Sequence, residues 1–411
     1  MALRPAQPDD IRPLAELWAL AFPGEHSVAD RVRMLEQGGP YGGLETAWVE
    51  EEDGRIVGAF RTLQMTEYLA GTPLPMLGLA SVAVSPSARR RGLGRRLCRH
   101  ALRIGRERGD VVSVLFPFRP AFYHALGWGL VGELHSYLFR PEDLTSFGDP
   151  NAVRLAGPED RTSIAECYAR VAARSNGPIQ RGERAWANHL DARGAHAFVY
   201  DKGGGVRGYL LASYGRSRAP EQRVLHIREL IAEDDAAYRG LLGWIAAQRD
   251  QWRRVRYDAR RDENFGHRLS DPRPPGFRLS RALYFPSARV LRGPMLRILD
   301  VPAALAARRA WGGEPGIALT LEIEVQDPEL PENRGPWHLS IEEHGARVHP
   351  SGGGGADARL VTDAATFAQI YAGELLPTTA ARLGLAEIQG VPQALDRAFR
   401  VSQPFWLLDE F

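Results

Sequence analysis

The sequence predicts an α/β protein with mixed sheets, built from two tandem copies of one strand–helix unit and a third α/β unit at the C-terminal end. Three observations lead to this prediction. Apolar runs typical of strands alternate with runs at helical spacing along the 411 residues. One order of elements occurs twice, and a different alternating strand follows it. The length suffices for two or three domains, each with its own core.

The elements of the first unit follow from its turn and cap residues. A helix is predicted after Asp9, where acidic residues precede apolar residues at helical spacing. Two extended runs then meet at Asp53-Gly54, which is a strong hairpin signal. A third run, "PMLGLASVAVS", leads into an arginine-rich loop and a helix that ends before Gly109. A buried strand, "VVSVLFP", and a short helix, "RPAFYHALG", complete the unit.

The second unit repeats this order with a changed loop. Residues 197–214 form another predicted hairpin, and residues 230–248 follow it as residues 82–100 follow the first. An ungapped alignment places Arg91-Gly92-Leu93 on Arg239-Gly240-Leu241, while Arg89, Arg90 and Gly94 become Ala237, Tyr238 and Leu242. The loop is now acidic, with Glu233, Asp234 and Asp235, and would repel an anion. We infer a tandem duplication in which only the first copy keeps its ligand site; chance similarity of two hairpin–helix units is the alternative.

The third unit begins near Pro286. The run "GIALTLEIEVQD" alternates as a half-buried strand does, and "PWHLSIEEHGARVHP" is its expected hairpin partner. Asp363 is predicted to cap the helix "AATFAQIYAG", and the chain closes on the apolar segment "FWLLDEF". We therefore expect domains at residues 1–140, 141–286 and 287–411.

Composition excludes several classes of protein. The net charge is +2, and basic and acidic residues alternate along the chain, so no nucleic-acid partner is expected. Cys98 and Cys167 lie far apart without a CxxC motif, which predicts neither a disulfide nor a metal site and favours two small buried residues. There is no signal-peptide pattern and no apolar stretch of about 18 residues. We expect a cytoplasmic protein without a membrane partner.

The stretch "VAVSPSARRRGLGRRL", residues 82–97, is the strongest functional motif. A strand that runs through a loop into a helix start presents backbone N–H groups without partners, and the helix dipole favours an anion there. Gly92 and Gly94 let the backbone approach a phosphate, and the arginines add fixed charge. The lysine and hydroxyl residue of a P-loop are absent. The stretch predicts a pyrophosphate site; a plain surface arginine cluster is the alternative, and it leaves the glycines unexplained.

Val82-x-Val84 followed by Arg89-x-x-Gly92-x-Gly94 resembles the acetyl-coenzyme A signature of the GCN5-related N-acetyltransferases, the GNAT family. The resemblance implies acetyl-CoA as co-substrate and no metal. It also implies that the main chain around Val82 pairs with the pantetheine arm and that the loop holds the pyrophosphate. The implied residues are Val82, Ala83, Val84, Arg89, Arg90, Arg91, Gly92, Leu93, Gly94 and Arg95. With a degenerate second unit and a third unit similar to sterol carrier proteins, the chain resembles the Eis-type members of the family, which implies a hexamer.

The same resemblance implies direct transfer to an amine without an acyl-enzyme, so neither cysteine is required. The general base would be the α-carboxylate of Phe411, and the general acid Tyr123, which precedes a Gly-aromatic-Gly turn. A backbone N–H near Val82 would polarise the carbonyl. The alternatives are a terminal phenylalanine and a tyrosine that only pack in a core. Three nearby histidines, at positions 100, 124 and 135, are expected to be surface or packing residues.

For the acceptor, the resemblance implies primary amines of polycationic small molecules such as aminoglycosides. Glu25 and Glu410 are the candidate substrate-binding residues, because a cationic acceptor calls for an acidic pocket. The segment "FPGEHSVADRVRMLEQGG" lacks the tryptophan of better-known members, which weakens the aminoglycoside assignment more than acetyl transfer. Two alternatives stay open: lysines of a protein or peptide as acceptors, and a non-enzymatic protein that binds acyl-CoA or lipid.

Overall fold

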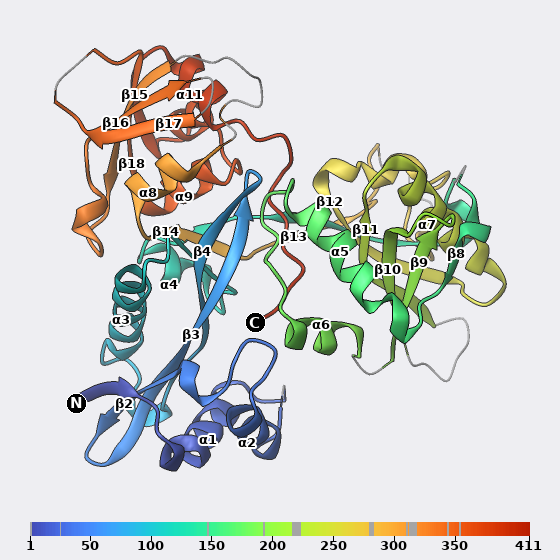
Figure 1. Ribbon diagram of the computed structural model, residues 1–411, viewed down its shortest axis with the longest axis horizontal. Coiled ribbons are helices and arrows are strands. Elements are labelled where there is room, and N and C mark those ends of the chain that lie inside the picture. Colours follow the sequence, from blue (N-terminus) through green and yellow to red (C-terminus); the bar gives the residue numbers. More distant parts are fainter. Residues whose placement is uncertain are drawn as a thin grey trace. The chain divides into compact units, whose positions relative to one another are not determined.

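The computed structural model (Figure 1) describes residues 2–24, 26–145, 148–191, 194–215, 223–278, 283–309, 311, 319–342, 345–352 and 355–411. The chain forms two compact units. The first comprises Met1–Val131, Asn176–Gln180 and Gly293–Phe411, and the second comprises Gly132–Ser175 and Arg181–Arg292. In the described ranges, no helix is both long and apolar enough to cross a membrane.

The first unit contains a seven-stranded mixed sheet. Its order is β1 (Ala2–Pro5), β2 (Ala47–Glu52), β3 (Arg55–Leu69), β4 (Thr72–Val84), β5 (Val112–Leu115), β14 (Met295–Ile298) and β6 (Gly129–Leu130). Only β4 and β5 pair in parallel; the other neighbours are antiparallel. The predicted hairpin is confirmed, since Asp53 and Gly54 both have positive φ, as a two-residue turn of this kind requires.

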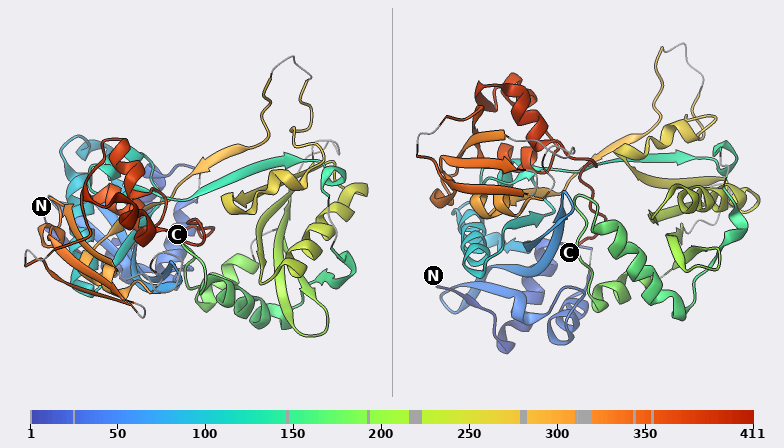
Figure 2. Two further views of the ribbon diagram at one scale, coloured as in Figure 1. Left: turned by 90° about the horizontal axis from the view of Figure 1, so that it is seen from above. Right: turned by 45° about the horizontal axis from the view of Figure 1, so that its top comes forward.

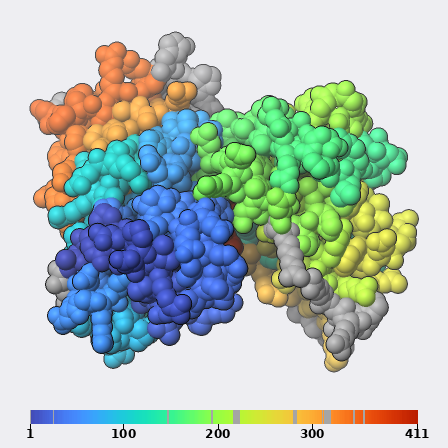
Figure 3. Space-filling view, turned by 60° about the horizontal axis from the view of Figure 1, so that its bottom comes forward, coloured from blue at the N-terminus to red at the C-terminus, as the bar shows by residue number. Residues whose placement is uncertain are grey.

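Helices cover both faces of this sheet. On one face, α1 (Ile11–Ala21) packs Leu14 and Trp18 against Ala59 of β3, and α2 (Val28–Gln37) lies against α1. On the other face, α3 (Leu93–Arg108) packs Leu97 against Phe60 of β3. The short α4 (Pro120–His124) follows β5. The dark blue surface in Figure 3 belongs to the N-terminal segment with α1 and α2.

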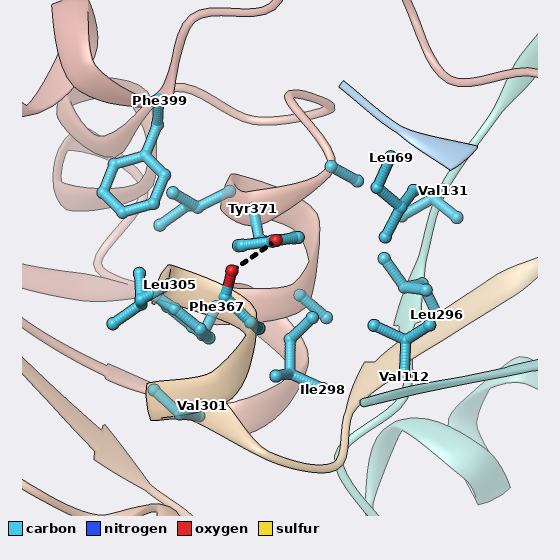
Figure 4. Close-up of a cluster of buried hydrophobic side chains, with 14 of the residues drawn as sticks. Leu69, Val112, Val131, Leu296, Ile298, Val301, Leu305, Phe367, Tyr371 and Phe399 are labelled. Atoms are coloured by element: carbon cyan, nitrogen blue, oxygen red, sulfur yellow. Dashed lines mark hydrogen bonds between the residues drawn. The ribbon is translucent and has the colours of Figure 1, made fainter. Parts of the chain in front are cut away.

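A second sheet in the first unit belongs to the C-terminal part of the chain. Its order is β17 (Gly345–Pro350), β16 (Trp337–Glu342), β15 (Leu319–Gln326), β18 (Ala358–Asp363) and β19 (Ala386–Gly390), with helices α8 (Val301–Ala307), α9 (Ala364–Tyr371), α10 (Pro377–Arg382) and α11 (Pro392–Phe399). The predicted hairpin of β15 and β16 and the Asp363 cap are both confirmed. Figure 4 shows one apolar cluster that joins Leu69, Val112 and Leu296 of the first sheet to Phe367 and Phe399.

The second unit repeats the architecture of the first sheet. Its sheet order is β13 (Arg289–Arg292), β7 (Glu133–Phe139), β12 (Arg254–Arg260), β11 (Val224–Ala232), β10 (Val206–Tyr214), β9 (Ala195–Asp201) and β8 (Val153–Leu155), and its helices are α5 (Arg161–Ala172), α6 (Glu183–Leu190) and α7 (Asp235–Ala247). Again one inner pair is parallel, β11 with β12. The strand order matches that of the first sheet, and the predicted tandem arrangement is confirmed.

Each of these two sheets contains one strand from a distant part of the chain. β7 follows β6 directly in sequence but pairs with β12 and β13, whereas β14 follows β13 but pairs with β5 and β6. Figure 2 lets the reader follow both strands, β7 in teal and β14 in orange. The expected boundaries at residues 140 and 286 lie beside these exchanged strands and stay predictions.

One carboxyl group in β3 is buried without a hydrogen-bond partner among the described residues. Glu67 lies on the same face of the strand as Met65 and Leu69, and its side chain is fully buried. Neither of its oxygens accepts or donates a hydrogen bond among the described residues. Loss of solvation therefore raises the pKa of Glu67 well above its usual range, so the folded chain holds this group as a neutral acid.

We expect Glu67→Gln to stabilise the chain above about pH 5. The unfolded chain releases the Glu67 proton near a pKa of about 4.3, whereas the folded chain keeps it, so the native protein loses stability as pH rises. The amide removes this loss, which amounts to about 1.4 kcal/mol in the free energy of unfolding per pH unit until the folded pKa is reached. Urea titrations between pH 4 and 9 measure it, with exposed Glu107→Gln as control. Parallel profiles for the native and Glu67→Gln chains would contradict the expectation.

Candidate active site

The candidate site begins where β4 and β5 separate. β5 pairs with β4 only from Met76 to Gly78, yet β4 continues to Val84. The β5-side edge of residues 79–84 therefore has no strand partner among the described residues, although β3 still pairs with the other edge. Backbone groups on such an edge are free to pair with an extended ligand.

A bulge shapes this free edge. The register between β3 and β4 shifts opposite Ser81, whose φ of +53° is unusual for a residue other than glycine. The indole Nε1–H of Trp18 donates to the Ser81 carbonyl at 2.8 Å, so α1 holds the bulge in place. Val82 and Val84 follow on the face of α3, while Ala83 faces α1.

The arginine loop leads from this edge into α3. Arg90 has a φ of +61° and Gly92, the N-cap of α3, a φ of +76°. The first turn closes with the bond from Arg96 N–H to Gly92 O at 3.1 Å, and no side chain caps the N-terminus. Its first N–H groups are thus open to a ligand. A Cβ on Gly94 would lie 3.4 Å from the Phe122 ring, which is ordinary van der Waals contact, so α4 lies directly beside this helix start.

The loop arginines differ in their partners. Arg91 makes a bidentate pair with Glu52 of the β2–β3 hairpin, at 2.6 and 2.9 Å, and Arg95 donates to the Ala125 carbonyl at 3.3 Å. Arg89 and Arg90 are exposed and make no ion pair or hydrogen bond among the described residues. These two guanidinium groups are therefore the ones ready to meet an anionic ligand without breaking a native contact.

Tyr123 lies on α4 in an aromatic cluster. Its ring meets those of Phe122, Phe118 and Trp128 edge-on, with centroids 5.0, 5.7 and 6.0 Å away. Only 4% of Tyr123 is exposed. Burial, with a smaller contribution from Cys98, raises the pKa of the Tyr123 hydroxyl, so it is a phenol at neutral pH and able to give a proton.

The two cysteines are buried and free, as predicted. Burial raises the pKa of each thiol, Cys98 and Cys167, to about 12. Neither is a thiolate at neutral pH, and neither has the character of a nucleophile. Among the described residues, no group of three or more His, Cys, Asp or Glu side chains is placed to hold a metal ion.

The chain end lies at the separation of β4 and β5. A Cβ placed on Gly78, the last β4 residue paired with β5, would lie 3.1 Å from the Phe411 ring. The Phe411 ring also meets Phe116, just after β5, at 5.3 Å and Tyr41 at 6.0 Å. Phe411 is half-buried and Glu410 is exposed. The terminal residue thus lies where the free edge of β4 begins.

The structure describes only one of the two candidate substrate-binding residues. Glu25 lies outside the described residues, and Glu410 is exposed next to Phe411. The sequence patterns did not single out Phe116, Phe118 or Tyr41. The apolar run "VLFPF" could have indicated the first two, because it continues beyond the buried strand; nothing local marks Tyr41.

Three known domain patterns match the chain. The sequence pattern of the GNAT acetyltransferase domain matches residues 2–131, a second GNAT acetyltransferase pattern matches residues 177–298, and a sterol carrier protein domain matches residues 301–407. The chain is an Eis-like member of the GNAT N-acetyltransferases. Its relatives agree with this assignment, and GNAT acetyltransferases use acetyl-CoA.

A Streptomyces avermitilis protein named as an uncharacterized N-acetyltransferase is 28% identical, covering 99% of this chain and 100% of its own. The N-acetyltransferase Eis of Mycobacterium tuberculosis is 28% identical, covering 82% of this chain and 81% of its own. The crystal structure of a GCN5-related N-acetyltransferase from Anabaena variabilis matches with a TM-score of 0.82 at 23% identity, over 100% of both chains, and shows the shared fold.

In the second GNAT module of this Eis-like chain, α7 corresponds to α3, and its N-terminus is capped by a side chain of the chain itself. The Asp234 carboxylate accepts from Ala237 N–H at 2.8 Å and so caps α7. Arg207 and Arg170 pair with Asp234 and Glu233, each at 2.6 Å. A Cβ on Gly240 would clash with the Tyr200 ring at 2.3 Å. The chain's own carboxylate thus occupies one of the helix-start donors, the Ala237 N–H, whereas no side chain caps α3.

Proposed function

We propose that this GNAT enzyme transfers an acetyl group from acetyl-CoA directly to a primary amine of a polycationic, aminoglycoside-like small molecule. The observation that carries the proposal is the position of Phe411 over Gly78, which puts the chain's terminal residue where β4 leaves β5. Acetyl-CoA supplies the acetyl group as a thioester. The residues of the site suit this molecule in its extended form.

The free edge of Val82, Ala83 and Val84 offers the amide pairing that a peptide-like pantetheine arm requires. The open N–H groups of residues 92–95 and the unpaired Arg89 and Arg90 suit a pyrophosphate. Arg91 forms an ion pair with Glu52. Because this pair is half-exposed, breaking it so that Arg91 can bind a phosphate costs little free energy. Leu93 and Arg95, in the first turn of α3, complete the proposed acetyl-CoA site.

Two groups of the chain move protons in this proposal. The Phe411 α-carboxylate accepts the proton of the substrate ammonium, so that the amine nitrogen can form the new bond to the acetyl carbon. The Tyr123 hydroxyl gives its proton to the sulfur as the carbon–sulfur bond breaks, and the nitrogen returns a proton to the Tyr123 oxygen as it loses its second proton and becomes an amide. A backbone N–H near Val82 donates to the carbonyl oxygen and stabilises its growing negative charge. Glu410, exposed beside Phe411, and Glu25 would attract a cationic acceptor.

An acceptor panel tests the substrate class. We expect kcat/KM to be at least tenfold higher for polyamines and aminoglycosides than for lysine peptides, with each acetylated product identified by mass. A preference for peptides would reassign the enzyme to protein lysines. Binding of CoA without acetylation of any acceptor would favour a protein that binds acyl-CoA.

Neutralising the two unpaired arginines is expected to weaken CoA binding. Arg89→Gln with Arg90→Gln should raise the CoA dissociation constant about 10- to 100-fold, because a hydrogen bond to a charged group contributes about 1.5–3 kcal/mol. Affinity for pantetheine, which lacks the pyrophosphate, should not change. Calorimetric titration measures both, and Arg103→Gln, an exposed arginine farther along α3, is the control. Unchanged CoA affinity in the double variant would remove these arginines from the site.

The assembly and location belong to the same proposal. We infer self-association into a hexamer, as the Eis resemblance implies, and a cytoplasmic location, where acetyl-CoA is available. Leu283 and Tyr284 of the second unit are 86% and 84% exposed, which is unusual for large apolar side chains and suits an interface. Light scattering of the full chain measures the assembly, and a monomer would contradict it.

A further inference from the structure

The last eleven residues of the chain have no helix or strand of their own. After α11, residues 401–411 run as an irregular tail toward the first sheet, drawn in red in Figure 1 and ending at the label C. Phe405, Trp406 and Leu407 are nevertheless buried. Because no ladder of backbone bonds fixes the tail, individual contacts must set where Phe411 comes to lie.

Asn176 makes four hydrogen bonds, and two of them hold this tail. Its Oδ1 accepts from Ala70 N–H at 3.0 Å, in the turn between β3 and β4. Its Nδ2 donates to the Ala372 carbonyl after α9 at 2.9 Å and to the Gln403 carbonyl in the tail at 3.3 Å. The main-chain carbonyl of Asn176 accepts a hydrogen bond from Trp406 N–H at 2.9 Å. One side chain thus joins the sheet, the C-terminal domain and the tail.

The segment that carries Asn176 is itself fixed on β3. Gly177 N–H donates to the Tyr68 carbonyl at 2.6 Å, and Gln180 N–H donates to the Thr66 carbonyl at 2.8 Å. The tail backbone passes so close that a Cβ on Gly177 would lie 2.3 Å from the Trp406 carbonyl, and the φ of Gly177 is +112°. Asn176 therefore lies in a segment that is hydrogen-bonded to β3, and the tail packs directly against this segment.

A second contact lies nearer the chain end. The Tyr41 hydroxyl donates to Asp409 Oδ1 at 3.3 Å, and the Tyr41 ring meets the Phe411 ring at 6.0 Å. Between Trp406 and Phe411 lie four residues, so a slip of one residue at Asn176 would displace the terminal carboxylate by about 3.3 Å. A catalytic group displaced by even 1 Å loses much of its rate advantage.

We propose that Asn176 is a positioning residue for catalysis: its hydrogen bonds to the Gln403 carbonyl and the Trp406 N–H set the register of the tail and so place the Phe411 α-carboxylate at the separation of β4 and β5. This inference rests on the proposed role of that carboxylate as the base. Asn176 does not touch the reacting atoms; it acts through the tail.

The experiment compares three full-length variants under saturating acetyl-CoA. Asn176→Ala removes the side-chain bond to the Gln403 carbonyl and keeps the main-chain bond to Trp406, so it tests the side-chain part of the register. It should lower kcat at least tenfold at pH 7 while the KM for acetyl-CoA stays within twofold. Without a placed base only the neutral amine reacts, so the rate of Asn176→Ala should rise about tenfold per pH unit between pH 7 and 9, toward an amine pKa of about 10.4. A chain with one glycine after Phe411 should show the same pH dependence.

Asn333→Ala is the matched control. Asn333 is also fully buried in the first unit, and it bonds Arg106, Val301 and Asp327 at 3.0–3.1 Å without touching the tail. Its loss should lower the unfolding midpoint but keep the native pH profile. Should Asn176→Ala not fold, Asn176→Ser takes its place, because a hydroxyl is too short to reach the Gln403 carbonyl.

The outcomes separate the two claims. If the added glycine leaves the rate and pH profile native, the terminal base is wrong and the role of Asn176 falls with it. If the glycine removes activity but the Asn176 variants keep native kcat and pH profile, the terminal base stands and the positioning role is overturned. A change in Asn333→Ala equal to that in Asn176→Ala would reduce the effect to lost stability.

Discussion

A single glycine added after Phe411 is expected to lower kcat about 10²- to 10⁴-fold, the usual range for loss of a general base. The addition converts the α-carboxylate at its present position into a neutral amide and moves the new carboxylate about 3.8 Å away. The Phe411 ring can keep its contacts with Phe116 and Tyr41, and the arginine loop is untouched. Affinity for CoA should therefore stay within about twofold of native.

Initial rates with a saturating amine, together with calorimetric CoA titration, measure this result. A chain with one glycine added at the N-terminus is the control for the extra residue. Native turnover in the C-terminally extended chain would rule out the α-carboxylate as the base and would leave Phe411 as a packing residue.

Replacing Tyr123 by phenylalanine is expected to lower kcat about 10²- to 10³-fold with little effect on folding or CoA affinity. Phenylalanine keeps the edge-on contacts with Phe118, Phe122 and Trp128, so only the hydroxyl is lost. The loss arises because the leaving thiolate must then depart without a proton. It should shrink for an acetyl thioester of a more acidic thiol, which needs protonation less.

Stopped assays of thiol release with acetyl-CoA and with an aryl thioester measure both effects. Tyr371→Phe serves as control, because it removes another buried hydroxyl of the same unit, the one that donates to the Ala304 carbonyl (dashed line in Figure 4). Equal losses for both thioesters, or no loss at all, would contradict the role of Tyr123 as the acid.

Local signals predicted most of the elements that build the site. The Asp53-Gly54 turn, the helix that ends before Gly109 and the internal repeat all follow from residues close together in sequence. The acidic residues of the second loop also anticipated its chemistry, since Asp234 now caps α7. These features depend on short-range backbone preferences, which a sequence displays directly.

The features that position the site depend on distant contacts. Nothing near Ser81 shows that Trp18 holds its carbonyl, and nothing in β7 or β14 shows that each pairs outside its neighbouring strands. Asn176 lies 227 residues before Gln403, the tail residue that it binds. Such pairings are decided by packing of the whole unit, so a single sequence contains no local pattern for them.

Acceptor-dependent release of CoA thiol by the full native chain with a free C-terminus tests acetyl transfer most directly. We expect purified protein and acetyl-CoA to release little thiol alone, and a polycationic amine to raise the rate with one acetylated amine formed per thiol. CoA binding without amine-dependent thiol release would contradict it, and would leave the arginine loop as a binding site without transfer chemistry.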